Sequence, residues 1–420
     1  MIYDKAIDIL RSIIKDEATL IEARFDNKYF TRNRKMGFKQ AVCMMLDMQD
    51  ASIKERLNLF RLMCGKLSSI SRQAFSKLRA KFDHSPLKKM FHAIVDHMYN
   101  GNHSLKTFKG YALLAVDGTY IKLLTGSSLD ERYNGKGHKD NISMGMSVIH
   151  DVLNNIVVDF TTADGNMNER KEFIQQLDTV IEKYPLQLAN SIITADRGYP
   201  SSDIFKILHD KGLKFVIRCT NSFSNAITNC PLGFTTITDD TGVEIRILKF
   251  IGKNNQIITL ATNLMDFSED ELKQIYKLRW LIETSFNTLK NKLFADRNLG
   301  RTYNSVMQDI WASMVVHNLV GIVQYEADAL IESRAINAKK QQGFILSKNK
   351  KKELKHQYRT NTKYLISHLR SIYIFAGLLL DSWRYECDLS AIIETVIESK
   401  TEKIPECYSV NIVSKNFHAA

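Results

Sequence analysis

The sequence predicts an α/β protein built on an open sheet, and two apolar segments are the main reason. Residues 111–116 and 191–195 show almost no alternation of polar and apolar positions, which is typical of strands buried on both faces. Each segment is followed directly by an aspartate, Asp117 or Asp196, and then by a nearby glycine. Between them, residues 169–183 have apolar side chains at helical spacing. Strands and helices therefore alternate along the middle of the chain.

The other elements follow from the same periodicities. The candidates, in order, are strands at 143–149 and 156–160 joined by a hairpin at 151–155, a helix at 202–211, and strands at 215–217, 243–251 and 256–260. The last two strands lie in a stretch rich in Thr, Ile and Asn. Residues 1–100 are poor in glycine and predict helices almost throughout.

The two aspartates are candidate catalytic residues because the strand ends of an open sheet bring loops together at one crevice. A strand-end aspartate also has an ordinary explanation, since it often caps a helix or forms a turn. A third acid, Glu283, makes three coincidences less plausible. It lies in a helical segment with Tyr276, Arg279 and Lys290, at offsets of 3, 7 and 14 residues from Tyr276, which places all four along one side of a helix.

A surface pair of Glu283 with Arg279 at i, i+4 is the plain alternative for the third acid. If instead the three carboxylates meet, their repulsion requires a cation. Mg²⁺ or Mn²⁺ suits such oxygen ligands, and two ions can assist displacement at phosphorus. Arg279 and Lys290 would then contact the neighbouring phosphates.

These blocks, Asp117-Gly118-Thr119, Asp196-Arg197-Gly198-Tyr199 and the Tyr-Arg-Glu-Lys set, resemble the DDE transposases of bacterial insertion sequences in the group named for its Y-R-E-K signature. The resemblance covers roughly residues 30 to 325. It implies a ribonuclease-H-like core, that is, a mixed five-stranded sheet flanked by helices, with a β-rich insertion at about 219–266. The predicted insertion contains no tryptophan, unlike relatives that hold a flipped base there.

The resemblance also implies site residues and cofactors. Asp117, Asp196 and Glu283 would be catalytic and would hold two Mg²⁺ (or Mn²⁺) ions. Tyr276, Arg279, Lys290 and, on the opposite side, Arg197 would contact DNA beside the scissile phosphate.

Three consecutive domains are predicted: a helical DNA-binding domain at 1–105, a catalytic domain at 106–325 and a helical, basic C-terminal region at 326–420. In the first domain, Ser71 is a candidate N-cap for a basic helix that resembles the second helix of a helix-turn-helix pair. Its candidate DNA contacts are Arg72, Lys77, Arg79 and Lys81. The alternative is a helix whose basic side chains simply face water.

Composition favours a polyanionic partner, because 58 lysines and arginines outnumber 46 aspartates and glutamates, for a net charge of +12. The chain has no run of eighteen apolar residues and no signal peptide. We therefore expect a cytoplasmic, nucleoid-associated bacterial protein with no membrane contact.

The expected function is a DNA transposase that cuts transposon ends and joins them to target DNA. Its expected partners are the inverted repeats of the transposon ends and the target DNA, with the protein a homodimer in the synaptic complex. Two alternatives remain open: a ribonuclease-H-like nuclease without strand transfer, and a domesticated transposase-derived protein that only binds DNA.

Overall fold

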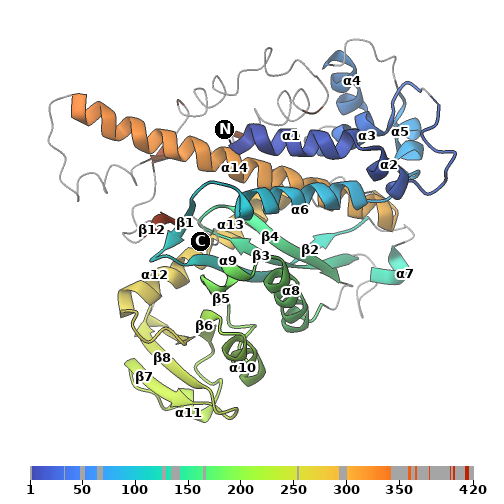
Figure 1. The fold of residues 1–420 in the computed structure, drawn as a ribbon. Helices are drawn as coiled ribbons and strands as arrows, with labels where there is room; N and C mark the ends of the chain where they lie inside the picture. The colour runs from blue at the N-terminus through green and yellow to red at the C-terminus, as the bar shows by residue number, and fades with distance from the viewer. Residues whose placement is uncertain are drawn as a thin grey trace. The chain divides into compact units, whose positions relative to one another are not determined.

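The computed structural model describes residues 2–32, 34–47, 53–63, 70–124, 129–133, 142–163, 167–252, 255–292 and 300–341, with short segments at 358–360, 365–366, 378, 398, 401–402 and 412–415. The chain forms two compact units (Figure 1). A helical unit comprises Met1–Met98, Ile121–Ser143 and Asn287–Tyr408, and a sheet unit comprises Tyr99–Tyr120, Met144–Phe286 and Ser409–Ala420. The chain therefore passes from one unit to the other five times, which differs from the three consecutive domains expected.

The helical unit is organised around one long helix, α14 (Tyr303–Gln341). Its other elements are α1 (Ile2–Lys15), α2 (Glu17–Ala23), α3 (Phe38–Leu46), α4 (Ile53–Met63), α5 (Arg72–Arg79), most of α6 (Ser85–Asn100), α7 (Asp130–Tyr133), the π-helical turn η2 (Thr288–Lys292), β10 (Tyr358–Arg359) and β11 (Thr401–Glu402). Helices α1 and α3 pack against α14. The backbone N–H of Ile2 donates a hydrogen bond to the Glu326 carboxylate of α14.

Helix α14 is long and apolar enough, over Tyr303–Ala338, to cross a membrane by length and composition, and its apolar window is entirely buried within the protein. Burial accounts for the apolar character of this window, because the part of a helix that is surrounded by protein has no face that requires polar residues. The predicted domain boundary at residue 325 lies inside this helix. Beyond α14, most of the predicted helical, basic C-terminal region at 326–420 lies outside the described residues.

The sheet unit is built on one eight-stranded mixed sheet in the order β4-β3-β2-β5-β6-β9-β8-β7. The strands are β2 (Ala112–Lys122), β3 (Ser143–Asp151), β4 (Ile156–Ala163), β5 (Ser191–Ala195), β6 (Lys214–Cys219), β7 (Gly233–Thr238), β8 (Glu244–Ile251) and β9 (Ile257–Thr262). Strands β2, β5 and β6 are parallel, and all five residues of β5 are buried. A separate pair is formed by β1 (Leu105–Phe108) and β12 (Ile412–Lys415).

The helices that accompany this sheet are α8 (Glu169–Lys183), α9 (Pro185–Ala189), α10 (Ser202–Asp210), α11 (Asn225–Thr228), α12 (Glu269–Arg279) and α13 (Leu281–Asn287). Helix α8 contacts β4, α10 contacts β6, and α12 contacts both β5 and β6. A reciprocal cap starts α12, in which Ser268 Oγ accepts from the Glu271 N–H and the Glu271 carboxylate accepts from the Ser268 N–H. This cap fixes the beginning of the helix that leads to Glu283.

The predicted core strands are present, including the hairpin in which Asp151 pairs with Ile156. The predicted insertion does not form a separate layer. Its strand β9 pairs with β6, with Cys219 opposite Thr259, so that β7, β8 and β9 extend the five-stranded core into eight strands. The free edge of β6 supplies unpaired backbone groups, and β9 satisfies them.

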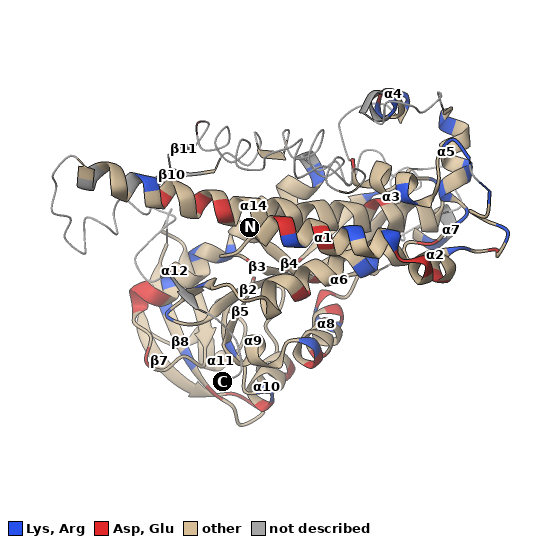
Figure 2. Cartoon of the chain, turned by 45° about the horizontal axis from the view of Figure 1, so that its top comes forward, with Lys and Arg blue, Asp and Glu red and all other residues tan. Residues whose placement is uncertain are grey.

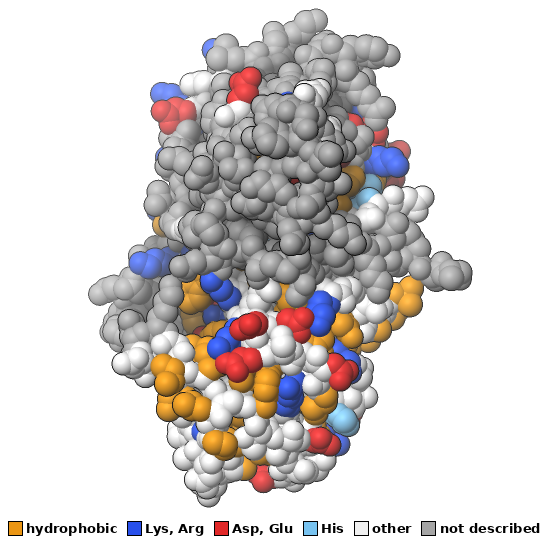
Figure 3. Space-filling view, turned by 90° about the vertical axis from the view of Figure 1, so that its left-hand side faces the viewer, with side chains coloured by type: hydrophobic (Ala, Val, Ile, Leu, Met, Phe, Trp, Pro, Cys, Tyr) orange, Lys and Arg blue, Asp and Glu red, His pale blue; other side chains and the backbone are white. Residues whose placement is uncertain are grey.

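Exposed apolar side chains mark the outer part of this extension, at Leu232, Phe234, Ile251 and Ile257. Figure 3 shows hydrophobic side chains interspersed with acidic and basic ones over the described part of one face. Cations lie over two aromatic rings of this extension. The Arg246 guanidinium is 3.6 Å from the ring centre of Phe234, and the Lys273 ammonium is 4.7 Å from that of Phe250.

Candidate active site

The first two acids of the predicted site stand side by side in the sheet unit. In the parallel ladder of β2 and β5, Val116 pairs with Ala195, and this is the last paired position. Asp117 and Asp196 are the next residue on each strand. Strand β2 itself continues to Lys122, so Asp117 lies within a strand and not at its end, and the point where its pairing with β5 stops defines the site.

The adjacent strand contributes a cation. Ala195 pairs with Ile217 of β6, so Arg218 follows at the same level as Asp196. Nη1 of Arg218 donates a hydrogen bond to the Tyr276 hydroxyl at 3.1 Å, and that hydroxyl lies 3.5 Å from Oδ1 of Asp196. Tyr276 of α12 is thereby held between a strand-borne cation and a strand-borne acid.

The third acid reaches the site through a helix that is interrupted. The sequence predicts one helix from Tyr276 to Lys290, whereas α12 ends at Arg279, α13 begins at Leu281, and a π-helical turn follows at Thr288–Lys292. The break is small, because the Trp280 N–H still donates to the carbonyl of Lys277 at 3.2 Å. Glu283 therefore keeps its predicted relation to Arg279.

Arg279 lies between two of the acids. Its Nη2 is 3.2 Å from Oε1 of Glu283 and its Nη1 is 3.8 Å from Oδ2 of Asp117, while only 2% of the side chain is exposed. Nε and Nη1 have no hydrogen-bond partner, although both are buried. One guanidinium thus balances two carboxylates in a partly desolvated site, with donor capacity left over.

Burial dominates the electrostatics of these acids. Burial, with smaller contributions from the carboxylates of Glu169 and Asp196, raises the pKa of Asp117 to about 6, against the opposing effect of Arg279. The pKa of Glu283 is also raised by burial and lowered in part by Arg279. The site accordingly disfavours additional negative charge and favours a cation.

Among the described residues, no three carboxylate, histidine or cysteine side chains stand close enough together to hold a metal ion as they are placed. The donor set still suits a hard divalent cation, because it consists of carboxylate oxygens. The positive charge between two of them comes from a single side chain, Arg279. Coordination by Asp117, Asp196 and Glu283 together would require that side chain to shift.

Comparison with known proteins identifies the family. Residues 108–319, half of the 420-residue chain, match the family model of the transposase DDE domain. The chain belongs to this family. The transposase is thus an enzyme that cuts and joins DNA, and enzymes of its kind generally depend on a divalent metal.

A solved structure gives the same fold over nearly the whole transposase. The cryo-EM structure of a piggyBac transposase synaptic complex with hairpin DNA aligns with a TM-score of 0.50 at 10% sequence identity, covering 93% of this chain and 84% of that one. This likeness supports the ribonuclease-H-like core. No curated protein matched the chain by sequence.

Two other predicted contacts of the transposase near the site stay predictions. Arg197 is exposed in the turn after β5, where a phosphate can reach it. Lys290 lies in η2, which belongs to the helical unit.

The predicted DNA contacts of the helical unit divide into two kinds. Ser71 caps α5 as expected, accepting from the Ala74 N–H at 3.2 Å, and Arg72 and Lys77 are exposed on that helix. Figure 2 marks the basic positions of α5 in blue. Lys81 is half-buried, with its ammonium 5.2 Å from the Tyr29 ring centre. The exposed residues remain candidates for phosphate contacts.

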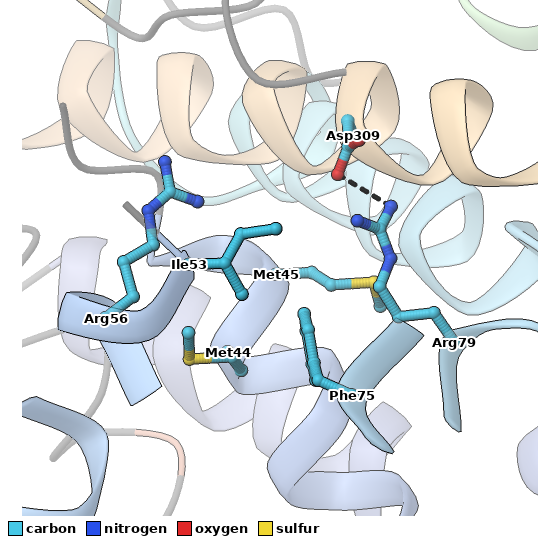
Figure 4. A pocket seen from close by; sticks show the side chains of 7 residues that line it. All are labelled: Met44, Met45, Ile53, Arg56, Phe75, Arg79 and Asp309. Carbon is cyan, nitrogen blue, oxygen red and sulfur yellow. Dashed lines mark hydrogen bonds and ion pairs between the residues drawn. The ribbon is translucent and has the colours of Figure 1, made fainter. Parts of the chain in front are cut away.

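Arg79 differs from the expectation, because it is buried and fully engaged. Its guanidinium donates to Asp309 Oδ1 at 2.7 Å, Gln308 Oε1 at 3.0 Å and the Ser305 carbonyl at 2.7 Å. Figure 4 shows this pair beside a small cavity lined by Met44, Met45, Ile53, Arg56, Phe75, Arg79 and Asp309. Arg79 therefore ties α5 to α14, and its charge is not presented to DNA.

Sequence reasoning missed Arg218 and Glu169, which adjoin the candidate acids, and Trp280, which follows Arg279 in the chain. Arg218 follows the predicted strand 215–217 as the aspartates follow theirs, and that position was the available signal. Trp280 lies at the break between α12 and α13, and 61% of its surface is exposed. The sequence predicts one continuous helix here, so it offers no reason to expect an exposed tryptophan at a break. Glu169 begins α8, where an acid is ordinary, so its position beside Asp117 and Asp196 carried no signal.

Proposed function

We propose that this transposase cuts transposon ends and joins them to target DNA with Asp117, Asp196 and Glu283 as its catalytic acids. The observation that carries the proposal is the parallel register that sets Asp117 beside Asp196, together with the Arg279 bridge from Asp117 to Glu283. Two acids from adjacent inner strands and one from a helix thus lie around the point where β2 and β5 stop pairing. All three lie within residues 108–319, the part of the chain that matches the family domain.

The cofactor we propose is Mg²⁺, or Mn²⁺ in its place, as two ions held by the three carboxylates. When bound, such ions activate the attacking oxygen and stabilise the leaving one. The protein's own residues do the rest. The Tyr276 hydroxyl, fixed by Arg218, orients Asp196, and Arg279 moves from the acids to the phosphate as negative charge is neutralised between them.

The chemistry has two steps of the same kind. In cleavage, a water oxygen forms a bond to the scissile phosphorus and loses its proton to solvent, while the bond to the 3′ oxygen breaks and that oxygen leaves as a hydroxyl. In joining, the freed 3′ hydroxyl attacks a phosphorus of the target strand, and the 3′ oxygen of the target leaves. The number of phosphodiester bonds is unchanged in the second step, so no external energy source is needed.

We propose the inverted repeats of the transposon ends and the target DNA as the substrates, and a homodimer as the synaptic form. The net charge of +12 and the exposed Arg72, Lys77 and Arg197 support a long polyanionic partner. We further propose that the protein works in the bacterial cytoplasm, associated with the nucleoid, without membrane contact.

The test uses Glu283→Gln, which keeps the side chain's shape and removes its charge. In Mg²⁺ this variant should bind DNA carrying the flanking inverted repeats nearly as the parent does, and should fail to nick it. Glu269→Gln is the matched control, because Glu269 starts α12 and forms an ion pair with the half-buried Lys273 of the same helix. Full nicking by Glu283→Gln would overturn the proposal.

A joining assay with ends that are already cut separates this function from its alternatives. Transfer of such ends into a target plasmid identifies a transposase. Nicking without transfer indicates a nuclease, and binding without either indicates a domesticated DNA-binding protein.

A further inference from the structure

A fourth carboxylate adjoins the paired aspartates. Glu169 is the first residue of α8, directly after the N-cap Asn168, whose side chain accepts from the Lys171 N–H at 3.2 Å. Its carboxylate packs against the glycine that follows Asp117: a β-carbon added at Gly118 would lie 2.7 Å from Cδ of Glu169 and would also collide with Oε1. Only a residue without a side chain leaves room for this carboxylate next to Asp117.

The same carboxylate faces the turn after Asp196. A β-carbon added at Gly198 would lie 3.7 Å from Oε2 of Glu169, an ordinary contact distance. The turn and the helix are held together, since Arg170 Nε donates to the Gly198 carbonyl at 3.0 Å. The ring of Phe173, one turn further along α8, packs edge-on against Tyr199 with centres 6.0 Å apart. These contacts hold the first turn of α8, which carries Glu169, against the turn after Asp196.

Within the described part of the chain, no lysine or arginine forms an ion pair with Glu169. Its pKa is raised first by burial and then by the charge of Asp196. The nearby Tyr199 hydroxyl is buried beside Ser147, and burial together with the charges of Glu169 and Asp117 raises its pKa, against the opposing effect of Arg279. A carboxylate with no ion-pair partner among the described residues thus adjoins the acids, and Arg279, the cation at this site, pairs with Asp117 and Glu283 instead.

Helix capping does not account for this arrangement. An acid in the first turn of a helix is favourable because of the helix dipole, but that effect needs only proximity to the N-terminus, at or near the surface. Glu172, in the same first turn, already provides it. The burial of Glu169 against Gly118 costs free energy that the dipole alone does not recover.

We propose that Glu169 is a fourth oxygen ligand of the divalent-metal site, reached from α8 across the gap left by Gly118. The inference rests on the proposed function, in that it assumes metal binding by Asp117, Asp196 and Glu283. A fourth carboxylate, contributed by a different helix, would help to bind the divalent ion once the Arg279 guanidinium has moved away from the acids.

The experiment measures Mn²⁺ binding to the full chain without DNA, by calorimetry and by loss of the free-ion electron paramagnetic resonance signal. Glu169→Gln should raise the Mn²⁺ dissociation constant about tenfold or more. Glu172→Gln, the matched control on the same helical turn, should stay within about twofold of the parent, because its carboxylate lies outside the site.

A second pair of variants leaves all carboxylates in place. Gly118→Ala should weaken Mn²⁺ binding because the new methyl group displaces the Glu169 carboxylate, whereas Gly198→Ala should not, since its methyl group fits at contact distance. In the Glu169→Gln background, Gly118→Ala should have no further effect. This pair keeps the test informative if Glu169→Gln does not fold.

The two proposals fail differently. If Asp117→Asn and Asp196→Asn weaken Mn²⁺ binding while Glu169→Gln and Gly118→Ala leave it unchanged, the role of Glu169 is wrong and the three-acid site stands. If Asp117→Asn and Asp196→Asn also bind Mn²⁺ like the parent, the proposed metal site itself is wrong.

Discussion

Nη1 of Arg279 lies 3.8 Å from Oδ2 of Asp117, and the arginine side chain is only 2% exposed. A positive charge is thus buried at the place where the acids of the site meet. It supplies part of the neutralisation that a divalent ion would supply, and the two cations are therefore expected to compete.

Arg279→Ala tests this competition. The metal-free variant should lose about 1–3 kcal/mol of unfolding free energy, because Asp117 and Glu283 lose their shared counter-charge in a partly desolvated site. It should nevertheless bind Mn²⁺ more tightly than the parent, as measured by calorimetry. Arg279→Lys, which keeps the charge, is the control. Weaker Mn²⁺ binding by Arg279→Ala would contradict the argument.

The raised pKa of Asp117 predicts a pH dependence of stability. The carboxyl titrates near 3.8 when unfolded and at about 6 when folded, so the folded state holds the proton more tightly between these values. Stability should be unaffected by this group below about pH 4, fall as pH rises to about 6, and stay at its lower level above, with a total change of up to about 3 kcal/mol.

The check is urea unfolding in a chelator from pH 4 to 8. Asp117→Asn should show a flatter profile and should be more stable than the parent above pH 6. Part of the slope will remain, because the pKa of the fully buried Asp151 is also raised to about 6 by desolvation. A parent-like slope in Asp117→Asn would refute the assignment.

The sequence could predict Asp117 and Asp196 because the signal is local: an unbroken apolar strand followed by an acid. It could not predict the partner of Arg79, since Asp309 is 230 residues away and helical periodicity says nothing about which buried acid a basic residue meets. The pairing of Cys219 with Thr259 was equally out of reach, because an alternating pattern defines a strand and leaves its neighbour undefined.

The hydrogen bond from Arg218 to Tyr276 predicts energetic coupling between these side chains. Tyr276→Phe and Arg218→Ala should each slow nicking, and the double variant should be no slower than the worse single one, because both act through the orientation of Asp196. The coupling should be about 0.5–3 kcal/mol in a double-mutant cycle on the nicking rate. Additive effects would show that the two residues act separately.

Arg79 and Lys77, two residues apart on α5, should behave in opposite ways. Arg79→Ala should cost about 3–5 kcal/mol of stability, because it leaves Asp309 buried without its partner. Lys77→Ala should leave stability within about 0.5 kcal/mol and weaken DNA binding, with a shallower dependence on salt. Unfolding curves and salt-dependent DNA titrations distinguish the two. A stable, DNA-binding-deficient Arg79→Ala would reverse our assignment.

The exposed Trp280, next to Arg279 in sequence, should report on bound DNA. Stacking of an unpaired base on an aromatic ring contributes about 1–3 kcal/mol, so Trp280→Ala should weaken binding of ends with unpaired terminal nucleotides by that amount and leave fully paired DNA less affected. Quenching of its fluorescence in the parent provides a direct readout, with Trp280→Phe as the control. Equal affinity of all three proteins for unpaired ends would exclude stacking at this position.

The repeated crossing of the chain between its two units limits how the enzyme can be dissected. A gene fragment encoding residues 99–286 would omit β12, the strand that pairs with β1, and one encoding residues 1–98 would omit α14, against which α1 and α3 pack. Neither unit is encoded by one continuous segment of the gene, so neither can be expressed alone or exchanged by recombination as a single fragment. Deletion series of the usual kind would therefore report on misfolding, and point substitutions are the suitable way to assign roles to each unit.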